Sequence, residues 1–147
     1  MIYLAADHRG FPLKEKVKQW LTEWGYDYED MGAFEYDPAD DYPIYAKKVA
    51  ESMVEPEDRG ILVCGSGVGV DEVANKFDGI RSGLAINKEQ IFSARNDDDI
   101  NILALASDFT SEEESKEIVK TFLDTEFADE ERFSRRLKEI GEIEEEN

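Results

Sequence analysis

The stretch Ile61-Leu62-Val63-Cys64-Gly65-Ser66-Gly67-Val68-Gly69 decides the fold of this chain. An apolar run ends at Cys64 and glycines follow it, which predicts a buried strand over 60–64 and a turn that opens a helix over 68–76. Such a turn directs several backbone N–H groups at one point, where an anion such as a phosphate or an enediolate is stabilised. The same potential favours the thiolate of Cys64, although a thiol that only packs in the core fits the pattern as well. The glycine spacing differs from the dinucleotide-binding fingerprint.

Strand patterns alternate with helix patterns on both sides of this stretch. The alternation predicts a Rossmann-like α/β three-layer sandwich, with a five-stranded parallel sheet covered on both faces and a C-terminal helix. We expect a single domain over 1–147, with an acidic tail over 141–147 that frays. The predicted strands span 2–6, 26–30, 60–64, 81–85 and 101–105, and the predicted helices span 13–24, 44–53, 68–76, 88–96, a segment capped by Ser111 and Glu114, and 130–140.

The composition of the chain argues against several classes of binding partner and cofactor. The net charge is −19, from 36 acidic and 17 basic residues, so the chain repels nucleic acids and anionic membranes, and we expect neither as a partner. The single histidine excludes a multi-histidine metal site, and the single cysteine excludes an internal disulfide. We therefore expect no metal and no other cofactor. The first residues lack the pattern of a signal peptide and no apolar run approaches the roughly 20 residues of a membrane span, so we expect a cytoplasmic protein.

Polar residues gather where the predicted strands end, and a parallel sheet binds its ligand at that edge. Asp7-His8 follows the first strand; His8 could bind phosphate or move a proton, or Asp7 could cap a helix and leave His8 in solvent. Arg132 and Arg136 share one face of the last helix, which suits a phosphate, although pairing with Glu131 or Glu139 explains them equally well.

In their order and spacing these segments resemble the ribose-5-phosphate isomerase type B and galactose-6-phosphate isomerase family. The resemblance implies a Rossmann-like enzyme that interconverts an aldose and a ketose sugar phosphate without metal or nucleotide. It also implies a homodimer, or a tetramer made of two dimers, with sites shared between subunits. The segments that carry it are Ala6–Phe11, Asp41–Pro43, Gly60–Gly69, Ala74–Lys76, Gly79–Arg81 and Asn101–Leu105, within a similarity from Ile2 to about Ile140.

The resemblance also implies roles for particular residues. Cys64 would be the base that moves the proton between C2 and C1, and Ser66 would assist at the substrate oxygens. Backbone N–H groups of the turn would hold the enediolate as an oxyanion hole does. The remaining matches are substrate-binding positions: Asp7, His8, Tyr42, Gly65, Gly67, Val68, Gly69, Asp98, and Arg132 with Arg136 from the partner subunit.

Four positions depart from the family pattern. Ile86 stands where a ring-opening histidine is often found, and Asp97-Asp98 replaces a His-Asn pair. Asp108 stands where a phosphate-binding arginine is expected, and Phe133 replaces a histidine. We expect conversion of D-ribose 5-phosphate to D-ribulose 5-phosphate. The alternatives are another pentose or hexose phosphate, an unphosphorylated sugar, or a catalytically idle sugar-phosphate binding module.

Overall fold

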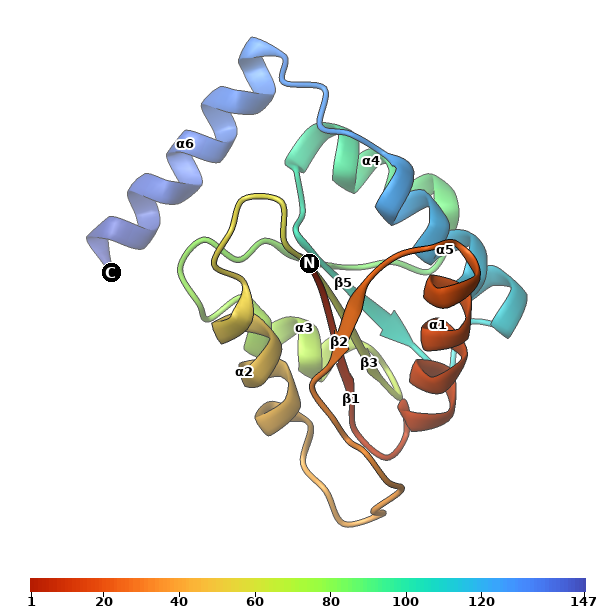
Figure 1. Ribbon diagram of the computed structural model, residues 1–147. Coiled ribbons are helices and arrows are strands. Elements are labelled where there is room, and N and C mark those ends of the chain that lie inside the picture. Colours follow the sequence, from red (N-terminus) through yellow and green to blue (C-terminus); the bar gives the residue numbers. More distant parts are fainter.

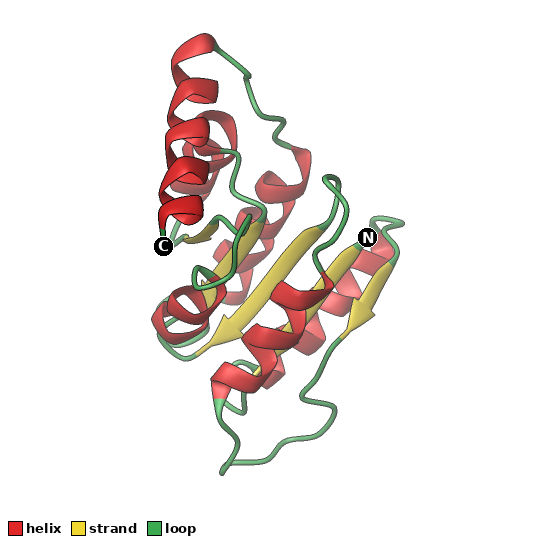
Figure 2. Cartoon of the chain, turned by 90° about the vertical axis from the view of Figure 1, so that its left-hand side faces the viewer, coloured by secondary structure: helices red, strands yellow, loops and turns green.

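The five predicted strands form one parallel sheet with the order β2-β1-β3-β5-β4 in a computed structural model that describes residues 1–147. Helices cover both of its faces (Figures 1 and 2), so the predicted three-layer α/β architecture is confirmed. The strands are β1 (Ile2–Ala6), β2 (Tyr28–Asp30), β3 (Arg59–Cys64), β4 (Ser82–Leu84) and β5 (Ile102–Ala106). The helices are α1 (Phe11–Glu23), α2 (Tyr42–Ser52), α3 (Val68–Ala74), α4 (Lys88–Asp98), α5 (Glu112–Asp124) and α6 (Glu131–Glu146).

Alternate residues of the central strands feed two apolar cores. In β3, Ile61 and Val63 pack with residues of α1, α4 and α5, whereas Leu62 and Cys64 pack with residues of α2 and α3. This alternation is the period of two of a strand that is buried on both faces. The thiol of Cys64 therefore points toward the α2–α3 side of the sheet.

The strand order fixes where a ligand can bind. The chain places β2 on one side of β1 and β3 on the other, so the connections that leave β1 and β3 run in opposite directions. In an open parallel sheet such a reversal leaves a crevice beyond the carboxyl ends of the two strands. Asp7 follows β1 and Cys64 ends β3, so both predicted segments face this crevice.

Most predicted boundaries hold, with differences at the edges. The predicted capping box of Ser111 and Glu114 at the start of α5 is confirmed. The edge strands β2 and β4 are shorter than predicted, since each pairs with one neighbour only. The expectation of a frayed tail over 141–147 is corrected: α6 continues to Glu146, because the Glu144 carboxylate accepts hydrogen bonds from Gly79 N–H at 3.0 and 3.1 Å. None of the helices has the length and apolar character required to cross a bilayer.

Candidate active site

The thiol of Cys64 sits at the end of β3, under the glycine turn. It is 4 % exposed, and its Sγ accepts a hydrogen bond from Gly67 N–H at 3.2 Å. The N–H groups of Gly65, Ser66 and Gly69 make no hydrogen bond within the chain, while Val68 N–H donates to Ser66 Oγ at 3.3 Å. Unpaired N–H groups beside a buried thiol provide a place for an anion that forms next to a base.

The turn needs its glycines for two close approaches. Gly67 has φ +73°, a left-handed conformation that favours glycine. Gly69 allows the ring of Tyr42 to lie on the start of α3, because a Cβ at this position would be 2.7 Å from the ring carbon Cζ of Tyr42. Since α3 ends at Ala74 and is a short helix, the positive potential here comes mainly from the turn N–H groups.

A pocket of about 230 Å³ opens over this turn. It brings together most of the residues that the sequence predicted to bind substrate, and it adds two that were not predicted, Arg9 and Glu72. The predicted residues in its lining are Asp7, Tyr42, Cys64, Gly65, Ser66, Val68 and Gly69. Gly67 lies behind them, against Leu84 and the backbone of Leu105 and Ala106.

His8 lies beside the pocket in a hydrogen-bonded arrangement with Asp40. The Asp40 Oδ1 atom accepts the backbone N–H of His8 at 2.9 Å and is 2.8 Å from His8 Nδ1. Asp40 is 6 % exposed in its side chain and its Oδ2 has no partner. Burial raises the pKa of the neighbouring Tyr45, and the Asp40 carboxylate raises it further, so this phenol stays protonated. Because the His8 ring is bonded to Asp40, the alternative of a solvated His8 is wrong. Asp7 accepts Gly10 N–H at 3.0 Å, but no side chain caps α1, so the alternative of Asp7 as a helix cap is not supported either.

Asp7, His8 and Asp40 are also the one group of side chains that could hold a metal ion. Their ligand atoms lie within 4.8 Å of one another. However, His8 Nδ1 is already bonded to Asp40 Oδ1, which removes one nitrogen and one oxygen from an open ligand set. The arrangement fits a carboxylate that orients an imidazole better than it fits a metal centre.

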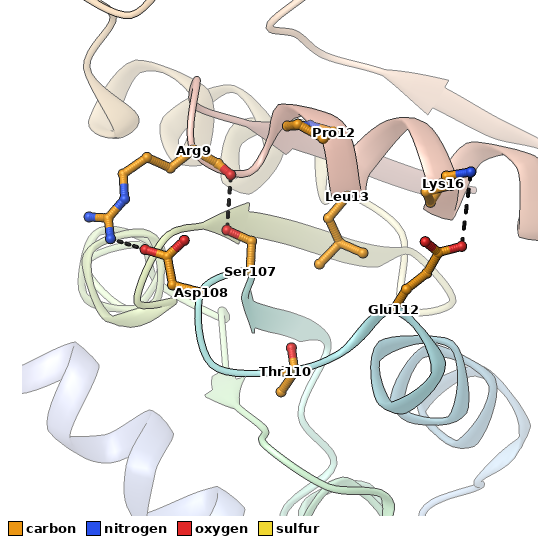
Figure 3. A pocket seen from close by; sticks show the side chains of 8 residues that line it. All are labelled: Arg9, Pro12, Leu13, Lys16, Ser107, Asp108, Thr110 and Glu112. Atoms are coloured by element: carbon orange, nitrogen blue, oxygen red, sulfur yellow. Dashed lines mark hydrogen bonds and ion pairs between the residues drawn. The ribbon is translucent and has the colours of Figure 1, made fainter.

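Asp108 follows β5 and pairs with the guanidinium of Arg9 (Figure 3). The sequence suggested that Asp108 leaves the site one cation poorer and one anion richer. The structure adds that the Asp108 carboxylate pairs with an arginine from the β1–α1 turn, so part of its charge is neutralised within the chain. Arg9 was overlooked because its partner is 99 residues away along the chain.

The other predicted residues do not reach this pocket. Arg132 and Arg136 belong to α6, which lies across the amino ends of the strands, opposite the turn (Figures 1 and 2). Hydrogen bonds hold this part of the chain there, from Ala128 N–H, just before α6, to the Asn96 carbonyl and from Gly79 N–H to the Glu144 carboxylate on α6. Asp98 ends α4 near the same edge. Because β3 alone spans about 20 Å, none of these side chains can enter the pocket of its own chain.

The arginines of α6 differ in their pairing. Arg132 lies 3.2 Å from Glu130, and Arg135 lies 3.0 Å from Glu131. The alternative of local pairing therefore holds for Arg132, with Glu130 and not Glu131 or Glu139. Arg136 has no carboxylate within ion-pair distance and stays available for an anion.

The site lies where the strand order of a parallel α/β sheet reverses, and it combines a thiol with unpaired backbone N–H groups and polar side chains. This combination is typical of an enzyme that stabilises an anionic intermediate. Residues 2–140 match the family model described as Ribose/Galactose Isomerase. A probable ribose-5-phosphate isomerase B of Mycoplasma pneumoniae is 42 % identical, over 97 % of this chain and 91 % of that protein. The chain therefore belongs to the ribose/galactose isomerase family and is an aldose–ketose isomerase.

Solved structures agree with this assignment. The ribose-5-phosphate isomerase B of Mycoplasma genitalium, determined with bound ribulose 5-phosphate, has a TM-score of 0.90 and 35 % identity, covering 99 % of this chain and 97 % of that one. The enzyme of Clostridium thermocellum has a TM-score of 0.94 and 36 % identity, with coverage of 99 % and 97 %. The fold is thus shared over nearly the whole length.

Proposed function

We propose that this chain converts D-ribose 5-phosphate to D-ribulose 5-phosphate, with Cys64 as the base. The observation that carries the proposal is the Cys64 thiol beneath unpaired turn N–H groups in a pocket of sugar size. The names of its relatives, and the ribulose 5-phosphate bound in one of them, support this choice of sugar phosphate.

The reaction needs a proton to move between two carbons. The Cys64 thiolate takes the proton from C2 of the open-chain aldose, and the electron pair forms the enediolate. The N–H groups of Gly65, Ser66 and Gly69 stabilise its negative charge, because they are fixed in place before the charge develops. The Ser66 hydroxyl assists the proton exchange between O1 and O2, and Cys64 then returns its proton to C1, giving the ketose.

Two copies of the chain would complete each site, as a homodimer or within a tetramer. Arg132, Arg136 and Asp98 would then come from the partner subunit, where the edge opposite Cys64 meets the pocket. The exposed apolar side chains support such coverage: Tyr42 and Val68, which line the pocket, are 37 % and 54 % exposed, and Ile140 and Ile143 on α6 are 43 % and 59 % exposed. Isolated exposed apolar side chains are ordinary, but groups of them at two opposite edges favour an interface.

The competing candidate is an unphosphorylated sugar. Two carboxylates, Asp7 and Glu72, line the pocket and could accept hydrogen bonds from sugar hydroxyls. Comparing kcat/KM for ribose 5-phosphate, ribose and allose separates the two. We expect ribose 5-phosphate to be preferred over ribose at least about 100-fold, because charge-assisted hydrogen bonds to phosphate are absent for ribose. Faster turnover of ribose would favour the competing candidate, and no turnover of any sugar would favour a binding module.

Arg136→Ala tests the shared site. We expect KM for ribose 5-phosphate to rise about 10- to 100-fold with little change in kcat, because a phosphate contact from the partner is lost. Mixing Arg136→Ala with Cys64→Ala chains should restore activity to about one quarter of wild type, since half of the random dimers are mixed and each mixed dimer has one intact site. The activity of the mixture is measured at a ribose 5-phosphate concentration below the raised KM of the Arg136→Ala variant. If mixing restores nothing, the two residues do not act in one shared site.

A further inference from the structure

Arg9 is a part of the pocket to which the proposed function gives no role. Its guanidinium lies against Gly65, the residue after Cys64, so closely that a Cβ on Gly65 would overlap it. The backbone of Arg9 is held there as well, because the Ser107 hydroxyl hydrogen-bonds both the Arg9 carbonyl at 2.9 Å and the Cys64 carbonyl at 3.1 Å. Figure 3 shows the hydrogen bond between Ser107 and the Arg9 carbonyl; Ser107 directly follows β5, and Arg9 lies in the turn after β1.

The charges of the pocket make Arg9 distinctive. It is the only cationic side chain among the residues that line the Cys64 pocket, and it faces two carboxylates, Asp7 and Glu72. In a chain with a net charge of −19, the surrounding potential opposes an anionic ligand. For an anion in the Cys64 pocket, Arg9 is therefore the one positively charged side chain that the same subunit provides.

The guanidinium also has N–H donors that make no hydrogen bond within the chain. Only its Nη2 is used within the chain, by the Asp108 carboxylate, while Nε and Nη1 make no hydrogen bond. The side chain is 53 % exposed, so a ligand can reach it from the pocket. A planar guanidinium with two free donors can donate two hydrogen bonds to the oxygens of a phosphate. The neighbouring Asp108 carboxylate reduces the positive charge with which Arg9 attracts that phosphate.

We propose that Arg9 binds the substrate's phosphate from the subunit that supplies Cys64, and that Asp108 partly masks its charge. This inference rests on the proposed function, and it names a specificity-determining residue for it. Arg9→Ala should raise KM for ribose 5-phosphate about 10- to 100-fold with kcat changed only a few-fold, as expected for the loss of a charge-assisted contact to the phosphate, which does not react. Arg9→Lys, which keeps the charge without the planar fork, should recover part of the loss.

Lys16→Ala is the matched control. Lys16 comes from α1, lines the neighbouring hollow of about 320 Å³, and pairs with the Glu112 carboxylate at 4.0 Å, just as Arg9 pairs with Asp108 (Figure 3). It does not line the Cys64 pocket. We expect KM to stay within about two-fold of wild type in this variant, because an exposed ion pair alone contributes little.

Two further measurements keep the inference falsifiable. Calorimetric titration with inorganic phosphate should show weaker binding in Arg9→Ala by a factor similar to that in KM, whereas turnover of ribose should not change. Asp108→Asn, which keeps an acceptor for Nη2 and removes the negative charge, should lower KM by about two- to five-fold.

The outcomes separate the inference from the proposed function. If wild type isomerises ribose 5-phosphate and Arg9→Ala behaves like wild type in KM and phosphate binding, only the inference is wrong. An equal loss for ribose and ribose 5-phosphate would also overturn it, since Arg9 would then act by shaping the turn. A higher KM in Asp108→Asn would contradict the masking role. If wild type does not isomerise ribose 5-phosphate, the proposed function fails, and the phosphate titration still tests Arg9 independently.

Discussion

Cys64→Ala lowers kcat for ribose 5-phosphate by at least about 100-fold, the contribution expected of a positioned general base. The thiol is the proton acceptor at the end of β3, and its replacement leaves the turn N–H groups and the surrounding pocket in place. Binding of the sugar phosphate should therefore persist while turnover stops. Steady-state kinetics coupled to detection of ribulose 5-phosphate, together with calorimetric binding of the substrate, measure the two effects separately.

The control for this substitution is Cys64→Ser, which keeps an atom in the position of Sγ but offers a much weaker base. We expect it to be nearly as inactive as the alanine variant and to melt close to wild type. If the alanine variant kept near wild-type turnover, the base would be another group of the pocket. Asp7 and Glu72 are the carboxylates that line it, so Asp7→Asn and Glu72→Gln would then identify which one acts.

We expect Gly10→Ala to destabilise the protein by about 3 kcal/mol, near the upper range for a side chain forced into a packed interior. Gly10 has an ordinary φ of −90°, so the reason is space and not backbone conformation. A Cβ at Gly10 would overlap the Val63 carbonyl and lie 2.5 Å from its carbon and 2.9 Å from the Val63 Cβ. Val63 belongs to β3, which is hydrogen-bonded on both sides to β1 and β5, so the strand cannot yield.

Thermal and urea unfolding measure this effect. A loss of about 3 kcal/mol corresponds to a Tm lower by roughly 6–12 °C for a domain of this size. The matched control is Gly141→Ala in α6, where the new methyl group meets no atom within 4 Å and should stabilise by up to about 1 kcal/mol through helix propensity. A Gly10→Ala variant that melts like wild type would show that the β1–α1 turn can move away from β3. Activity should also fall, because His8 and Arg9 lie in that turn.

The sequence alone was sufficient to predict the architecture and to place several candidate site residues at one edge of the sheet. The apolar run that ends at Cys64 and the glycines after it carry their meaning locally, because strand period, turn chemistry and helix capping depend on neighbours a few residues apart. The alternation of such segments then fixes a parallel sheet, and a parallel sheet fixes the edge at which its ligand binds. Asp7, Cys64 and Ser66 line one pocket in the structure, together with Tyr42, which the resemblance to the family had indicated.

Which charged side chains pair with one another could be determined only from the tertiary structure. Asp108 reads in the sequence as a missing cation, yet it pairs with Arg9 across 99 residues, and Asp40 orients His8 across 32. No local pattern encodes these pairs, because they depend on which strand ends the order β2-β1-β3-β5-β4 brings together. The chain after α5 carries α6 to the side of the amino ends of the strands, whereas Cys64 stands at the carboxyl end of β3, so Arg136 and Cys64 of one chain belong to opposite edges of the sheet. The spacing of residues in the sequence determines each helix and strand. The distances between charged residues in different loops depend instead on how the helices and strands pack.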